Sequence, residues 1–277
     1  MLALDPDVVE AAWQAFHGHL PEREEPPHPL GCHRGRISDR DCFEAILFRL
    51  VTGCSWDVAG RLGRGSETTL RRRRDEWVAA GVFDLLANEA LAAYDRIIGL
   101  DLNDVSMDAS AQKAPCGGED TGPSPTDRGK TGWKWSLAAD AAGIPLGWVA
   151  AGANRQDCIL VAATLDTIAT RGLLSEIATI HLDRGYDNGM VRTACVERGI
   201  GEVVVTKRRA PGKGRYRKRV PLGLRWPVER TNSWLSNFGQ LRRNTDRFSV
   251  HRLAQLALAV ALILTIKLVK RARRWSA

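Results

Sequence analysis

The sequence predicts an α/β protein in which a mixed sheet flanked by helices follows an all-α, helix-turn-helix-like domain. Two observations lead to this prediction. Apolar residues recur at helical spacing as far as residue 98, and from residue 104 they alternate as they do in strands. Strands and helices then follow one another to the end of the chain, which favours a sheet covered by helices. We therefore expect a helical domain over residues 1–100 and an α/β domain over residues 101–277.

Serine caps and glycine stops mark the helices of the first domain. Ser38, Ser55 and Ser66 each stand directly before a helical pattern, where a hydroxyl can accept a backbone N–H. Gly53 and Gly81 end two of these patterns, as glycines at helix C-termini commonly do. A short helix, a glycine turn and a longer basic helix follow one another, which is the element order of a helix-turn-helix. We therefore expect this domain to bind DNA.

The longer basic helix carries four consecutive arginines, residues 71–74. Four successive residues spread around most of a helix circumference, so they cannot all face one groove. Arg71, Arg72 and Arg73 are expected to contact DNA, because phosphate neutralisation needs clustered guanidinium groups. The alternative is a solvated face on which the arginines pair with Asp75 and Glu76.

The charge of the chain is distributed unevenly. Residues 207–277 hold 19 of the 40 lysines and arginines, but only two of the 32 acidic residues, Glu229 and Asp246. This segment therefore has a net charge of +17, whereas the rest of the 277-residue chain has a net charge of −9. Such polarity favours a polyanionic partner, nucleic acid first and a membrane surface second. A lone carboxylate in so basic a segment predicts that Glu229 has a functional role.

Cysteine usage and hydropathy argue against a secreted, zinc-binding or membrane-spanning protein. The six cysteines are scattered without a C-x-x-C pair and no signal peptide opens the chain, so free thiols in a reducing cytoplasm are expected. Cys32 lies near His28 and His33, but no second cluster would complete four zinc ligands. The uninterrupted apolar run 256–266 has 11 residues, fewer than the about 20 that span a bilayer, so we expect a buried core helix.

The second domain has a recognisable order of elements. The pattern predicts three strands (104–110, 134–139 and 145–151), a helix (154–170), a strand (177–183), a helix (189–198), a strand (201–206) and a long final helix. This is the element order of a ribonuclease-H-like fold.

Three acidic residues stand where such a sheet can gather them. Asp108 lies on the first strand, Asp183 at the end of the fourth, and Glu229 in the first turns of a helix that follows the fifth. Hard carboxylate oxygens suit Mg²⁺ or Mn²⁺. Two such ions can activate a nucleophile and stabilise the leaving oxygen during displacement at phosphorus. Each acid alone could equally be a helix cap or a surface residue.

The chain resembles bacterial insertion-sequence transposases of the DDE class, in the insertion-sequence-five group. The matching segments of the first domain are residues 52–56 (TGCSW) and 77–83 (WVAAGVF). Those of the second domain are residues 107–110 (MDAS), 129–132 (GKTG), 152–154 (GAN), 182–187 (LDRGYD) and 225–230 (RWPVER). The resemblance covers nearly the whole chain, and the last two segments are the most specific.

The resemblance implies an activity and a set of partners. Asp108, Asp183 and Glu229 would be the catalytic, metal-binding triad, holding Mg²⁺ or Mn²⁺ as two ions. The enzyme would cleave DNA at the ends of an insertion sequence and join the freed 3′-hydroxyl to target DNA. Its partners would be double-stranded DNA, namely the terminal inverted repeats and the target, with no membrane. A homodimer or larger assembly would act on DNA in the bacterial cytoplasm, in association with the nucleoid.

Basic residues beside these motifs are the candidates for DNA contact. In addition to the arginines of the first domain, we expect contacts from Lys130, Arg184, Lys207, Arg208, Arg209, Arg225, Arg230, Arg242 and Arg243. Two alternatives stay open from the sequence: a DNA-binding protein of transposase ancestry that no longer cuts, and a metal-dependent nuclease that does not join strands.

The chain departs from a related signature at two positions. That signature places a Tyr three residues before the Arg and a Lys seven residues after the Glu. This sequence has Leu222 and Ser236 at those positions. A role for the signature Lys in positioning DNA therefore does not transfer to this chain.

Overall fold

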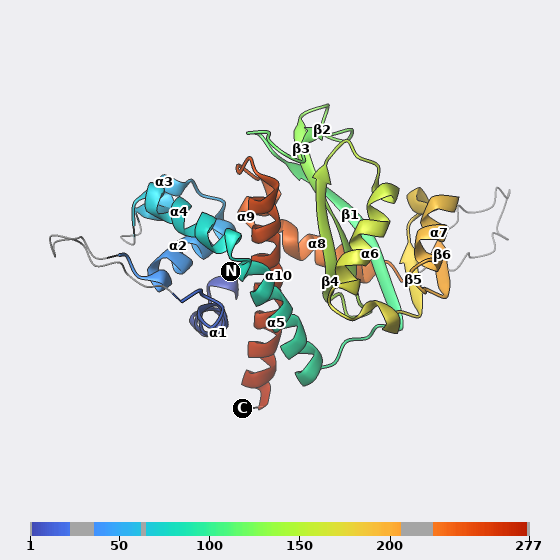
Figure 1. The fold of residues 1–277 in the computed structure, drawn as a ribbon, viewed down its shortest axis with the longest axis horizontal. Helices are drawn as coiled ribbons and strands as arrows, with labels where there is room; N and C mark the ends of the chain where they lie inside the picture. Colours follow the sequence, from blue (N-terminus) through green and yellow to red (C-terminus); the bar gives the residue numbers. More distant parts are fainter. Residues whose placement is uncertain (1, 23–35, 62–64, 206–223, 276–277) are drawn as a thin grey trace, which may run out of the picture. The chain divides into compact units, whose positions relative to one another are not determined.

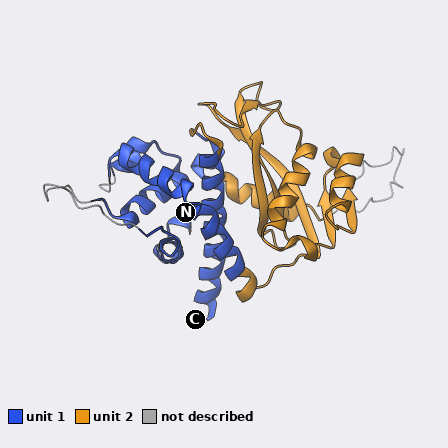
Figure 2. Ribbon diagram, viewed as in Figure 1, with its two compact units in different colours: residues 1–93, 237–244, 250–277 blue, residues 94–236, 245–249 orange. Residues whose placement is uncertain are grey.

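A computed structural model describes residues 2–22, 36–61, 65–205 and 224–275 of the chain (Figure 1). It contains two compact units (Figure 2): unit 1 comprises residues 1–93, 237–244 and 250–277, and unit 2 comprises residues 94–236 and 245–249. The chain therefore passes between the units four times. The division expected at residue 100 falls near the first passage, whereas residues 250–277 belong to unit 1.

Unit 1 is helical. Its elements are the 3₁₀ turn η1 (Leu2–Leu4), α1 (Pro6–His17), α2 (Asp39–Thr52), α3 (Trp56–Gly60), α4 (Glu67–Ala79), most of α5 (Val82–Ile97), α9 (Gly239–Arg242) and nearly all of α10 (Ser249–Trp275). The three expected caps are confirmed, since Ser38, Ser55 and Ser66 each accept a backbone N–H from the first turn of the following helix. Gly53 ends α2 with a φ of 77°, a conformation that side chains disfavour.

The core of unit 1 is aromatic. Phe16 packs against Phe43 with ring centroids 4.6 Å apart and meets Trp77 edge-on at 4.9 Å. Edge-on and offset ring pairs stabilise beyond their buried area. Helices α1, α2 and α4 are thus joined through one cluster of rings.

Helix α10 is the longest element, and it is apolar enough to cross a membrane by length and composition. Its most apolar window has a mean hydropathy of 2.0, and 67% of that window is buried inside the protein. The side chains from Leu256 to Leu264 are almost completely buried. The helix therefore matches the buried core helix expected from the sequence.

Unit 2 is built on a mixed sheet. Its strands are β1 (Asp104–Lys113), β2 (Gly122–Pro123), β3 (Thr131–Ala139), β4 (Pro145–Gly152), β5 (Thr179–Leu182) and β6 (Glu202–Val205). The strands run in the order β4-β3-β1-β5-β6, and the short β2 pairs with the first residues of β3. β3 is antiparallel to β1 and β4, whereas β5 and β6 run parallel to β1. Two antiparallel neighbours followed by two parallel ones is the ribonuclease-H-like topology that the element order predicts.

Helices cover both faces of the sheet. They are α6 (Val161–Ala169), α7 (Gly189–Val196) and α8 (Trp226–Ser236), with 3₁₀ turns η2 (Asp157–Leu160), η3 (Leu174–Glu176) and η4 (Arg184–Tyr186). Trp135 bonds to α8 through Asn232, and the next residue, Ser136, bonds to Thr164 of α6. Because successive strand residues point to opposite faces, α6 and α8 lie on opposite faces of the sheet.

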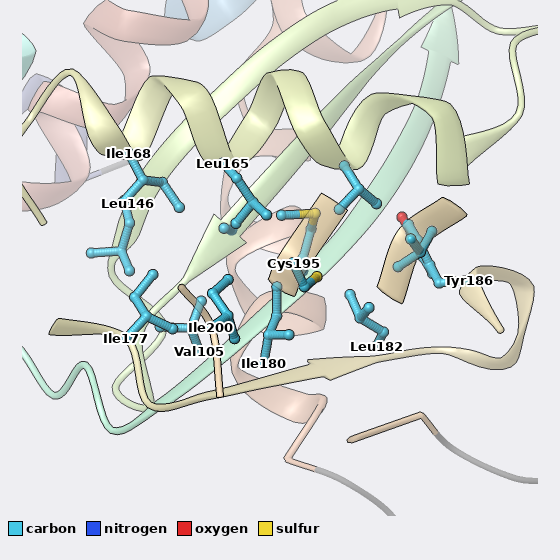
Figure 3. Close-up of a cluster of buried hydrophobic side chains, with 14 of the residues drawn as sticks. Val105, Leu146, Leu165, Ile168, Ile177, Ile180, Leu182, Tyr186, Cys195 and Ile200 are labelled. Carbon is cyan, nitrogen blue, oxygen red and sulfur yellow. The ribbon is translucent and has the colours of Figure 1, made fainter. Parts of the chain in front are cut away.

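The core beneath α6 and α7 holds the sheet in register. Val105, Ile180 and Leu182 from β1 and β5 meet Leu165 of α6 and Cys195 of α7 in this core (Figure 3). The helix expected from residue 154 starts as the 3₁₀ turn at Asp157 and becomes α-helical only at Val161.

Candidate active site

The three predicted acidic residues come from three different elements of unit 2. Asp108 lies within β1, Asp183 follows β5 directly, and Glu229 lies in the first turn of α8. Ser106 pairs with His181 across the parallel strands, and Asp108 and Asp183 each lie two residues beyond this pair. α8 packs on β1 and β3, and Arg230 and Thr231 of this helix donate to the carbonyls of Ala142 and Gly143 in the turn between β3 and β4.

Arg225 joins two of the three carboxylates. Its Nη2 lies 3.0 Å from Oε1 of Glu229 and 3.9 Å from Oδ2 of Asp183. The Arg225 side chain is only 27% exposed, so solvent screens these contacts less than it would at the open surface. Arg225 was expected to contact DNA, but in this structure it is the counter-ion of the acidic residues.

Asp108 is held by a short polar relay on the face beneath α8. The indole Nε1–H of Trp135 donates to Oδ1 of Asn232 at 2.8 Å, and Nδ2 of Asn232 lies 3.5 Å from Oδ2 of Asp108. The Trp135 bond orients the amide of Asn232, so that its NH₂ group points to the carboxylate. The structure therefore assigns Asn232, which the sequence reasoning missed, to the surroundings of the triad.

Burial is the main influence on Asp108. Together with the smaller effects of the neighbouring Asp183 and Asp157 charges, it raises the pKa of that carboxyl from 3.8 to about 6. The Ala109 backbone N–H and the Arg225 guanidinium act in the opposite direction. An acid whose pKa burial and like charges both raise is typical of functional sites.

Tyr186 and Lys134 are two further buried side chains that the charge of Asp157 influences. Burial, followed by the charges of Asp108, Asp157 and Asp183, raises the pKa of Tyr186 far above its usual value. Its hydroxyl has no hydrogen-bond partner within the described part of the chain. The Lys134 side chain is 8% exposed, and its ammonium donates to Oδ1 of Asp157 at 2.5 Å and to the Arg155 carbonyl at 2.7 Å. Asp157 thus neutralises the buried charge of Lys134.

The chemistry of the three acids fits a divalent cation. Carboxylate oxygens from different elements form the hard donor set that Mg²⁺ and Mn²⁺ prefer. In the described residues no three His, Cys, Asp or Glu side chains stand close enough together to hold a metal, and the Arg225 guanidinium lies between Glu229 and Asp183. Its positive charge compensates the two acids where a cation would otherwise do so.

Several of the basic residues expected to bind DNA are exposed. They are Arg71, Arg72, Lys130, Arg184, Arg242 and Arg243. Lys207, Arg208 and Arg209 lie outside the described residues. Arg230 lies between two indoles of α8, 4.3 Å from the Trp226 ring and 4.8 Å from the Trp234 ring, and donates to the Ala142 carbonyl. Its guanidinium therefore stabilises α8 against the turn before β4.

Arg73 corrects the expectation for the basic helix. It is 1% exposed, forms ion pairs with Asp39 and Glu76, and donates to the Ile37 carbonyl. A side chain enclosed in this way cannot reach a DNA phosphate. Its neighbour Arg72 is exposed and is free of this constraint.

We predict that substitution of Arg73 affects stability, whereas substitution of Arg72 affects DNA binding. Arg73→Ala should lower the free energy of unfolding by about 3 kcal/mol, because it removes a buried guanidinium that pairs with Asp39 and donates to the Ile37 carbonyl. Arg72→Ala should leave stability within about 0.5 kcal/mol and weaken DNA binding, with a shallower salt dependence by about one charge. Urea unfolding and DNA binding at several salt concentrations measure the two effects. Equal stability of the two variants would contradict the structural role of Arg73.

Comparison with known protein families agrees with this geometry. A family model described as "Putative transposase of IS4/5 family" matches residues 8–87, and one described as "Transposase DDE domain" matches residues 101–264. The "Putative transposase for insertion sequence element IS402" of Burkholderia cepacia is 39% identical over 151 residues, covering 52% of this chain and 67% of that protein. A second protein of that element, described as an uncharacterized 16.2 kDa protein, is 35% identical over 125 residues, covering 43% of this chain and 82% of its own length.

Solved structures of the Mos1 transposase are also similar. The pre-cleavage Mos1 transpososome aligns over 93% of this chain and 85% of its own, with 9% identity and a TM-score of 0.31. The Mos1 paired-end complex with Mn aligns over 93% and 86%, with 10% identity and a TM-score of 0.30. Likeness at this level adds nothing to the strand topology described above. The family matches across residues 8–87 and 101–264 and the Burkholderia relative show that the chain belongs to the insertion-sequence 4/5 family of DDE transposases.

Proposed function

We propose that the chain cleaves DNA at the ends of an insertion sequence and joins the freed ends to target DNA, with Asp108, Asp183 and Glu229 as the catalytic and metal-binding residues. The single observation that supports this most is Arg225, whose guanidinium contacts the carboxylates of Asp183 and Glu229 together. Asp183 follows a strand and Glu229 lies on a separate helix, so both can contact the Arg225 guanidinium only if their carboxylates lie near each other. Asp108 is close enough for Asp183 to raise its pKa.

The reaction proposed has two displacements at phosphorus. In the first, a water oxygen attacks the phosphodiester at the end of the element, and the bond from phosphorus to the 3′-oxygen breaks to leave a 3′-hydroxyl. In the second, that hydroxyl attacks a target phosphodiester and displaces the 3′-oxygen of the target strand. Bound divalent cations, proposed to number two, would activate the attacking oxygen and stabilise the leaving oxygen.

The protein residues supply position and charge for these steps. Asp108, Asp183 and Glu229 would hold the Mg²⁺ or Mn²⁺ ions through their carboxylates. Asn232 orients Asp108 through its amide. When cations bind the acids, the Arg225 guanidinium can leave Glu229 and Asp183 and pair with a DNA phosphate instead. The exposed arginines named above would contact the DNA backbone. In this proposal the terminal repeats are paired by a homodimer or larger assembly.

Cleavage of end DNA by the full chain tests the proposal. Duplexes carrying the terminal repeats should be nicked with Mg²⁺ or Mn²⁺ and joined to plasmid DNA. Asp183→Asn and Glu229→Gln should each lower the cleavage rate by about 10³-fold while DNA binding stays within about threefold of wild type. Asp187→Asn is the matched control, because its carboxylate is exposed in the same motif and pairs with Arg192 instead.

The outcomes separate the three functions that the sequence leaves open. Nicking with strand joining supports the transposase. Nicking without joining shows a nuclease, and DNA binding without nicking in either metal shows a protein that binds but no longer cuts. If Asp187→Asn lost as much activity as Asp183→Asn, the assignment of the triad would be wrong.

A further inference from the structure

His181 lies in the middle of the sheet and uses both of its ring nitrogens. It is the third residue of β5, where it pairs with Ser106 of β1 and Val204 of β6, and it is 8% exposed. Its Nε2 is 2.6 Å from Oδ1 of Asp104, and its Nδ1 is 3.1 Å from the backbone nitrogen of Leu224. The imidazole therefore joins the start of β1 to the segment that leads into α8.

The geometry fixes the roles of the two nitrogens. The backbone N–H of Leu224 can only donate, so Nδ1 of His181 accepts and carries no proton. The ring proton of the neutral imidazole is then on Nε2, where it is donated to the Asp104 carboxylate. Asp104 thus selects the tautomer that can hold Leu224.

Leu224 is directly followed by the residues that complete the candidate site. Arg225, the next residue, contacts Glu229 and Asp183 through its guanidinium. Its carbonyl accepts the Glu229 N–H at 3.3 Å, which closes the first turn of α8. The position of the Leu224 amide therefore influences both the guanidinium and the start of the helix that carries Glu229.

Loss of the hydrogen bond between His181 and Leu224 would affect stability and cleavage rate to different extents. One intramolecular hydrogen bond contributes about 1 kcal/mol to stability, which is a small share of the total. A displacement of about 1 Å in catalytic geometry can cost about 10²-fold in rate. Loss of the Leu224 bond should therefore change the rate of cleavage far more than the stability of the fold.

We propose that His181 is a positioning residue, which holds the Leu224 backbone so that Arg225 and Glu229 lie beside Asp183. This inference rests on the proposed cleavage function, because it concerns the same site. His181 touches neither substrate nor reacting atoms in this scheme. Its influence passes through the Leu224 N–H.

Two isosteric substitutions separate the two hydrogen bonds. The amide oxygen of Asn lies close to the position of Nδ1, so His181→Asn can still accept from Leu224. The amide nitrogen of Gln lies close to Nε2, so His181→Gln keeps the bond to Asp104 and loses the one to Leu224. We expect His181→Gln to lower the single-turnover cleavage rate by about tenfold to 10²-fold, whereas His181→Asn stays within about threefold of wild type. DNA affinity and the midpoint of thermal unfolding should be similar in both.

Amide hydrogen exchange at Leu224 gives a readout that does not depend on catalysis. Exchange at this amide should accelerate in His181→Gln and stay slow in His181→Asn and in the control Asp166→Asn, which removes only the exposed pair with Arg198. Equal rate losses in both His181 variants with a lowered unfolding midpoint would show a purely structural role and overturn the proposal. Unchanged Leu224 exchange in His181→Gln would also overturn it. If wild-type protein fails to cleave, the proposed function fails, and the exchange experiment still decides whether His181 holds Leu224.

Discussion

Asp108→Asn is expected to abolish metal-dependent cleavage and, in the absence of divalent cations, to make the protein more stable by about 2 kcal/mol at pH 8. Burial and the nearby Asp183 and Asp157 charges raise the pKa of Asp108 from 3.8 to about 6, so its ionised form is disfavoured in the folded state. Asn keeps the shape and can still accept the hydrogen bond from Asn232. It removes the negative charge that a bound cation would need. Urea unfolding and the cleavage assay measure the two effects.

The stability gain should depend on pH in a defined direction. Because the folded pKa is raised, the stabilising effect of protonating Asp108 is fully present below 3.8 and is lost as the pH rises through about 6. Wild type therefore loses stability over that range, whereas the Asn variant lacks this loss. The difference between the two proteins should be largest above pH 7 and should vanish below pH 3.8.

Asp166→Asn serves as the control, because its expected change in stability is opposite in sign to that of Asp108→Asn. The Arg198 guanidinium lowers the pKa of the exposed Asp166, so Asp166→Asn should slightly reduce stability at pH 8. If Asp108→Asn were no more stable than wild type at pH 8, burial would not disfavour its ionised form. If it retained cleavage, Asp108 would not be a member of the triad.

Gly239→Ala is expected to lower the free energy of unfolding by about 3 kcal/mol through a steric clash inside unit 1. A Cβ at Gly239 would lie 2.5 Å from the Gly53 nitrogen and 2.5 Å from the Thr52 carbonyl carbon. Both are backbone atoms at the end of α2, so neither can rotate away. Gln240 also donates to the Cys54 carbonyl at 3.3 Å, which ties the same two segments together. The shift of the urea midpoint gives the magnitude.

Gly189→Ala is the matched substitution at an open position. Gly189 begins α7 with a negative φ, and a Cβ there would meet no atom within 4 Å. Alanine has the higher helix propensity, so this variant should be as stable as wild type or more stable by about 0.5 kcal/mol. If Gly239→Ala behaved like Gly189→Ala, the close approach of α9 to α2 would not hold in solution.

The order of elements was predictable from the sequence because the local signals were strong. Serine caps, helix-ending glycines and alternating strands gave most element boundaries to within a few residues. The start of α6 was not predictable in this way, because residues 154–160 have helical composition while the backbone forms a 3₁₀ turn after β4. The membership of α10 in unit 1 also depends on long-range packing, which periodicity does not encode.

For the candidate site, the sequence located the acids but not what surrounds them. Asp108, Asp183 and Glu229 were found through motifs and strand ends, which are local features. Asn232 and His181 act through partners far along the chain, Trp135 and Leu224, and no local pattern marks such pairs. Arg73 was assigned to DNA because charge alone does not show burial. Its spacing of four from Trp77, a core residue on the same helix face, was the available signal.

Unit 1 combines segments from distant parts of the chain, and this has a consequence for synthesis. Arg273 of α10 pairs with Asp5 and Asp7, and His251 pairs with Asp75 of α4. A chain growing from its N-terminus will have completed the synthesis of all of unit 2 before residues 250–277 exist. The N-terminal helices of unit 1 therefore cannot pack against residues 250–277 until translation is nearly complete, and the apolar surface that these residues cover stays exposed until then. Pausing late in the message should leave nascent chains that chaperones bind through the first ninety or so residues.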